Sequence, residues 1–226
     1  LPLGLLLFRS MVATDKDVLA VTLTPDQVGV YLDSCLRAVG TATDLEDAIA
    51  ARAALVALDV SSKFEDEQSG AWSAVLMARA ERLSEMLARM LGVFIEDKTV
   101  CLRASSLIAT VLLLGEKDAR PMAIAECVAV ALETHSGSPE CVANLIEALI
   151  SVTVLPMTDE EQQETLRLLL RVTGDNLARH MEDNVDMCER ILVLVSRLVA
   201  FNSTLEDGLT LQVARHVVIG MAKYPD

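Results

Sequence analysis

Apolar residues recur at helical spacing along most of the chain, and short polar motifs mark where helices are predicted to begin. Thr24-Pro25-Asp26-Gln27 combines an N-cap hydroxyl, a proline at the first helical position and an acid in the first turn. One apolar stripe follows it, formed by Val28, Leu32, Cys35, Leu36 and Val39. Similar starts, each followed by its own stripe, lie at Thr43, Ser69, Ser138, Thr158 and Asn184. The pattern predicts an all-α chain of at least seven helices, the last over residues 209–223.

Residues 100–114 are the hardest segment to assign, because a short apolar run fits a buried helix as well as a strand. Its length and Ala104 favour a helix, which is our prediction. The segment is apolar on more than one face, so it is either central to the domain or covered by a partner. The candidate interface residues are Val100, Leu102, Leu107, Ile108, Leu112 and Leu113. Residues 1–8 are a second candidate for the same reason.

The helix starts suggest an internal duplication. They fall near positions 24, 44 and 69, and again near 138, 158 and 184. Thr24-Pro25-Asp26 matches Ser138-Pro139-Glu140, which predicts a helical array built from a duplicated three-helix unit. The expected division is an extended segment over 1–23, a first unit over 24–95, connector helices over 96–137, and a second unit with a C-terminal helix over 138–226. The alternative is that amphipathic helices with polar caps resemble one another anyway.

Composition and charge limit the classes of function and partner that the chain can have. The chain is 52% hydrophobic but only 3% aromatic, which favours a core of aliphatic side chains on packed helices. Its net charge of −14 would repel phosphate backbones and anionic lipids, so we expect no nucleic-acid partner. The longest uncharged run, 104–115, is shorter than the roughly 18–20 residues of a membrane span, so we expect no membrane insertion. The mean hydropathy of +0.41 is high for a chain with a net charge of −14. It suggests that other protein chains, or flanking parts of the same polypeptide, cover some of the apolar helix stripes.

No catalytic, cofactor-binding or metal-binding set can be assembled from the sequence. No two of the ten glycines are closer than eleven residues, so the loops that cradle phosphates are excluded. No two of the five cysteines are closer than fourteen residues, which excludes zinc-ribbon and redox motifs and favours buried helix-core thiols. The histidines do not fall at metal-ligand spacing. We therefore predict no enzyme activity. Asn202-Ser203-Thr204 is a candidate glycosylation site if the chain is secreted.

Two phrases of the sequence carry a family resemblance. They are Leu23-Thr24-Pro25-Asp26-Gln27, and Gly137-Ser138-Pro139-Glu140 leading to Met157-Thr158-Asp159-Glu160-Glu161. Over roughly residues 18–200 the chain resembles the helical ectodomain segment of polycystin-type and receptor-for-egg-jelly-type proteins. The resemblance implies a structural role at a ciliary or cell surface, within a longer polypeptide.

The prediction is thus a non-catalytic interaction segment, with a preference for the extracellular or ciliary surface over the cytoplasm. One alternative is a cytosolic adaptor of armadillo or HEAT type. Unpaired cysteines suit it, but its repeats run about 40–47 residues, whereas the expected period here is about 115. Another alternative is an enzyme or cofactor-binding bundle with a diffuse site.

Overall fold

The computed structural model describes residues 25–62, 75, 77–114, 121–153, 155, 157–180 and 185–201, together with 214–215, 218–219 and 222. In this part of the chain every regular element is a helix, which confirms the all-α prediction. The bounded helices are α2 (Pro25–Asp44), α3 (Ala48–Ser62), α5 (Ala80–Val93), α6 (Lys98–Leu114), α7 (Pro121–Thr134), α8 (Pro139–Val152), α9 (Asp159–His180) and α10 (Val185–Phe201). Residues 100–114 lie within α6 and are helical, as predicted.

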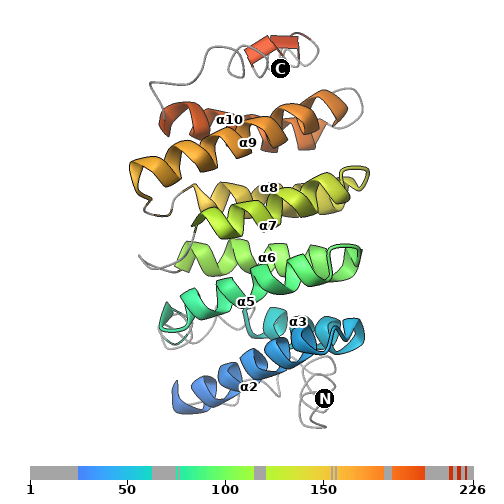
Figure 1. Cartoon of the computed structure of the whole chain (residues 1–226), viewed down its shortest axis with the longest axis vertical. Helices are drawn as coiled ribbons and strands as arrows, with labels where there is room; N and C mark the ends of the chain where they lie inside the picture. The colour runs from blue at the N-terminus through green and yellow to red at the C-terminus, as the bar shows by residue number, and fades with distance from the viewer. Residues whose placement is uncertain are drawn as a thin grey trace.

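Successive helices pair as antiparallel hairpins, and the hairpins stack along the long axis of the molecule (Figure 1). The pairs are α2–α3, α5–α6, α7–α8 and α9–α10. Stacking produces two columns: α2, α5, α7 and α9 form the first column, and α3, α6, α8 and α10 form the second. Second-column helices begin at residues 48, 98, 139 and 185, which are 41–50 residues apart, and first-column helices begin at residues 25, 80, 121 and 159, which are 38–55 residues apart.

This packing does not support the duplicated three-helix unit, which stays unconfirmed. The expected alignment places α2 on α8 and α3 on α9. However, α2 and α3 form one hairpin, whereas α8 and α9 belong to different hairpins, and α2 lies in the first column while its expected equivalent α8 lies in the second. Helices α6 and α7, from the range predicted as a connector, are members of the second and third hairpins. Caps and apolar stripes mark the start of any amphipathic helix, so their recurrence does not say which helices become neighbours.

A continuous aliphatic core runs through the described hairpins. Ala54, Ala104 and Ala148, one each in α3, α6 and α8, are fully buried, and small side chains at such positions allow helix axes to approach closely. Cys35, Cys101, Cys141 and Cys188 are buried and Cys127 is half-buried, which agrees with the predicted core role. The low aromatic content is thus compatible with a well-filled interior.

The predicted interface on α6 needs a correction. Val100, Leu107, Ile108 and Leu112 are buried in the chain's own core, and Leu102 is partly buried against it. The reason is that α6 packs against α3, α5 and α8, so its apolar faces are covered from within the chain. These four side chains therefore belong to the core around a central helix, and they do not form a surface for a partner.

Several predictions fall on other parts of the chain. The side chain of Leu113, the candidate glycosylation site at Asn202, the helix start at Ser69 and residues 1–8 lie outside the described residues. Most of the predicted last helix over 209–223 does so too. In the described part, no helix combines the length and the apolar character needed to cross a membrane.

Candidate interaction surface

The turn between α2 and α3 is set by backbone hydrogen bonds. The N–H of Asp47 donates to the carbonyl of Ala42 (3.0 Å), and the N–H of Glu46 donates to that of Thr43 (3.2 Å). This is the Schellman pattern that closes a helix, and it places Glu46 in the left-handed region at φ 52°. Thr43, predicted to begin the next helix, is instead buried within α2, and its hydroxyl donates to the carbonyl of Val39 (2.8 Å).

Asp47 and Asp97 begin the second helices of the first two hairpins in the same way. One carboxylate oxygen of Asp47 accepts the N–H groups of Ile49 and Ala50, both at 3.0 Å. One oxygen of Asp97 accepts those of Thr99 and Val100 at 3.0 and 3.1 Å. A carboxylate in this position satisfies amides that the helix cannot pair and interacts favourably with the helix dipole.

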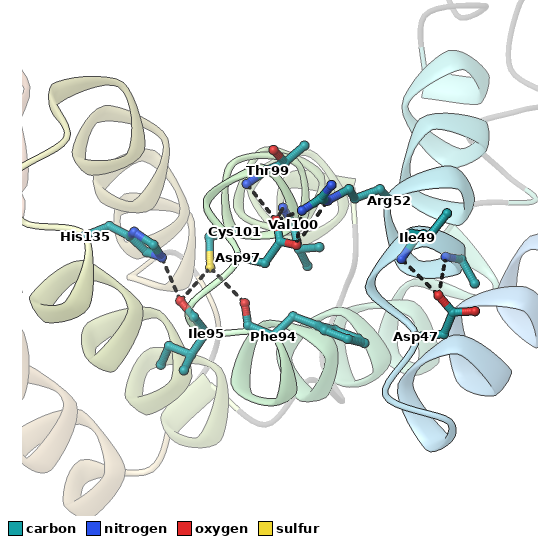
Figure 2. A network of polar contacts seen from close by, with 11 residues as sticks. Asp47, Ile49, Arg52, Phe94, Ile95, Asp97, Thr99, Val100, Cys101 and His135 are labelled. Carbon is teal, nitrogen blue, oxygen red and sulfur yellow. Dashed lines mark hydrogen bonds and ion pairs between the residues drawn. The ribbon is translucent and has the colours of Figure 1, made fainter.

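Asp97 also links the first hairpin to the second. Arg52 of α3 donates through Nε and Nη2 to the Asp97 carboxylate, and the Nη2–Oδ2 distance is 2.6 Å. Figure 2 shows this side chain reaching from α3 to the start of α6. One carboxylate therefore caps its own helix and holds the neighbouring hairpin in register.

The pKa of Asp97 reflects both roles. Burial by itself raises it, but the hydrogen bonds from Arg52 and from the N–H groups of Val100 and Thr99 lower it and prevail. The pKa of this carboxyl is therefore below its ordinary value, so Asp97 is ionised at neutral pH.

The second and third hairpins meet through a different set of groups. The Nε2–H of His135 donates to the carbonyl of Ile95 (2.6 Å), which also accepts the thiol of Cys101 at 3.4 Å (Figure 2). Desolvation by burial raises the pKa of Cys101 to about 12. Ser138 occupies the place of Asp97 in this turn, but its hydroxyl makes no cap hydrogen bond.

Ion pairs bridge each step of the stack. The cross-hairpin pairs are Arg79–Asp33, Arg89–Asp44 and Arg52–Asp97 between the first two hairpins, Lys98–Glu140 between the next two, and Arg171–Glu133 with Arg190–Glu147 between the last two. Most are half-exposed, and such pairs contribute little stability individually. Each pair joins a residue of one hairpin to a residue of the next, so these contacts accompany the apolar packing between hairpins.

Charge is divided unequally between the two columns. The helices of the first column carry twelve acidic and six basic side chains. Those of the second column carry five of each, so that column is neutral while the first has a net charge of −6. Protein interfaces are depleted of charge at their centres, so the second column is the better suited of the two to contact another protein.

Three exposed aliphatic side chains lie at or next to the turns of the first two hairpins. Leu45 and Ile49, in and after the first turn, are 72% and 76% exposed, and Val93 at the end of α5 is 41% exposed. Val93 follows Arg89 by one helical turn, and Arg89 pairs with Asp44, the neighbour of Leu45. We refer to Leu45, Ile49 and Val93 as the apolar edge.

Sequence reasoning missed Asp47, Asp97 and Arg52. The available pattern was an aspartate followed five or six residues later by an arginine, which occurs as Asp47 with Arg52 and as Asp97 with Arg103. Within the described residues no group of three metal-ligating side chains comes together. Desolvation also raises the pKa of Cys35, to about 11, and of Cys127 and Cys141, so these thiols are protonated at neutral pH and poor nucleophiles.

Comparison with known proteins adds no relative, since no protein-family model, curated protein or solved structure matches this chain.

Proposed function

We propose that this chain is a non-catalytic helical scaffold that binds other proteins through the face of its second column. The observation that carries the proposal is the polar network that joins neighbouring hairpins. Asp97 is its best-connected member, with two backbone amides and the guanidinium of Arg52 as partners. A stack held in register in this way presents a preorganised surface, which lowers the entropy cost of binding.

The composition of the second column supports the choice of face. Its exposed described residues include charged side chains of both signs in equal number, together with short polar and aliphatic side chains such as Ser106 on α6 and Val193 on α10. The first column presents a surface dominated by charged side chains, which are costly to desolvate when they are not paired by the partner.

Two settings for such a scaffold remain proposals. The second-column spacing of 41–50 residues is close to the about 40–47 residues of armadillo and HEAT repeats, which favours the cytosolic adaptor. Cys35, Cys101 and Cys141, which are buried and form no disulfide, favour the same setting. A polycystin-like ectodomain at a ciliary or cell surface is the other candidate, and a glycan on Asn202 would favour it.

Site-specific photo-crosslinking in the cells that make the protein tests the proposal. A benzophenone amino acid replaces Ser106 or Val193 on the second column, with Arg82 and Gln163 on the first column as matched controls. We expect the two second-column positions to yield the same protein adduct, identified by mass spectrometry, and the two controls to yield none. Absence of adducts at Ser106 and Val193, or equal labelling at all four positions, would contradict the proposal. A stoichiometric small-molecule mass on the native chain would favour a cofactor-binding bundle instead.

A further inference from the structure

The apolar edge has the two most exposed large aliphatic side chains of the described residues, Ile49 and Leu45. A single exposed leucine needs no explanation, but two of them beside the turn, with Val93 adjacent, form a local cluster. Leu45 and Ile49 are 72% and 76% exposed, whereas Val93 is 41% exposed and so partly covered by the chain itself.

Hydrogen bonds and an ion pair hold the backbone around the apolar edge in place. The Schellman bonds of Glu46 and Asp47 fix the turn, and the Asp47 carboxylate fixes the backbone of Ile49. The ion pair between Arg89 and Asp44, 2.7 Å long, holds the end of α2 to α5. Because the side chains are presented on a fixed backbone, a partner need not order the turn in order to bind it.

Charge around the edge selects the occupant. The two nearby arginines, Arg52 and Arg89, are already in ion pairs with Asp97 and Asp44. Glu46 and Glu96, in the turns that follow α2 and α5, are exposed, and no ion pair of either is seen among the described residues. The edge is therefore apolar with an acidic surround, on a chain whose net charge is −14.

We propose that the apolar edge binds a basic amphipathic helix of a partner protein, as a second contact surface beside the second-column face; this inference rests on the proposed scaffold function. An apolar stripe of the partner covers Leu45, Ile49 and Val93, while flanking lysines or arginines face Glu46 and Glu96. Long-range attraction to the acidic chain raises the association rate. A second copy of the chain and an anionic membrane both have the wrong charge for this site.

The probe is a synthetic, fluorescein-labelled helical peptide of leucine and lysine, about 18 residues or about five turns long, with leucine along one stripe. Fluorescence anisotropy gives its affinity for the full 226-residue chain. An otherwise identical peptide of leucine and glutamate controls for charge. The test variant is L45S/I49S, and the matched control is V30S/V130S, which removes two exposed valines elsewhere on α2 and α7. Circular dichroism checks that both variants are folded.

We expect the leucine–lysine peptide to bind the wild type and V30S/V130S alike, and to bind L45S/I49S about tenfold more weakly. The leucine–glutamate peptide should not bind. No binding to the wild type, equal affinity for all three proteins, or equal binding of both peptides would overturn the proposal. A concentration-dependent dimer of the wild type that L45S/I49S abolishes would overturn it in favour of a second copy. Crosslinks from Ser106 do not depend on this edge, so they would still report on the scaffold function if the edge proposal failed.

Discussion

Replacing Asp97 by alanine should destabilise the fold more than replacing Asp47, although both side chains cap a helix in the same way. Each aspartate accepts two backbone amides at 3.0–3.1 Å. Loss of such a cap costs about 1 kcal/mol. Asp97→Ala also removes the acceptor of Arg52, so the difference between the two variants isolates the link between hairpins.

The additional loss is modest, because solvent screens the pair. The side chain of Asp97 is 13% exposed but that of Arg52 is 49% exposed. We therefore add only about 0.5–1 kcal/mol for the lost pair. The expected totals are about 1.5–2 kcal/mol for Asp97→Ala and about 1 kcal/mol for Asp47→Ala. In a chain of this size these losses lower Tm by about 3–8 °C and about 2–4 °C respectively.

Urea unfolding followed by circular dichroism measures both variants. A double-mutant cycle with Arg52→Ala and Asp97→Ala measures the coupling directly. The pKa of Asp97 is lowered by folding, so its contribution is present above its ordinary value of 3.8 and is lost as the pH falls through the lower folded value. The gap between wild type and Asp97→Ala should therefore be constant near neutral pH and shrink in acid. Equal losses for the two aspartate variants, together with zero coupling in the cycle, would refute the register role of Asp97.

Three further predictions follow from single positions. Glu46→Gly should stabilise the fold by about 0.5–1 kcal/mol in urea unfolding, because glycine adopts the left-handed φ of 52° without strain; a loss would contradict the turn geometry. Ile108→Ala should cost about 2–5 kcal/mol and Ile108→Val about 0.5–1.5 kcal/mol by the same assay, since the side chain is fully buried; a loss below about 0.5 kcal/mol for alanine would argue for a surface role. Iodoacetamide at pH 8 should label the half-buried Cys127 before Cys35 and Cys101, whose pKa values are raised to about 11 and about 12, and all should react rapidly in urea; peptide mapping reads the order.

Local features of the fold could be predicted because they depend on residues close together in sequence. The helix start predicted at Thr158 is confirmed and forms a capping box: the N–H of Thr158 donates to the Glu161 carboxylate (3.0 Å), and the N–H of Glu161 donates to the Thr158 hydroxyl (3.3 Å). Pro139 is at the start of α8, as its position after Ser138 predicts. The interior of α6 is helical, because its length and alanine content outweigh its β-branched residues.

One local prediction was wrong. Thr43 with Asp44 resembles a helix start, yet α2 continues through both and ends at a Schellman turn built on Glu46. The hydroxyl of Thr43 donates to the Val39 carbonyl within α2 instead of capping a new helix. The helix start at Ser138 is confirmed, since Ser138 is the N-cap residue of α8, although its hydroxyl makes no cap hydrogen bond.

The sequence by itself determined that the chain is helical, where several helices begin, and that its interior is aliphatic. Tertiary structure alone decided that helices pair two by two, that α6 lies at the centre of the stack, and that Arg52 meets Asp97 across 45 residues of chain. An apolar stripe states how much of a helix must be buried but not which neighbour buries it. Long-range pairs such as Arg52 with Asp97, and the exposure of Leu45 and Ile49 at the edge, depend on how the hairpins stack, and no local pattern encodes that.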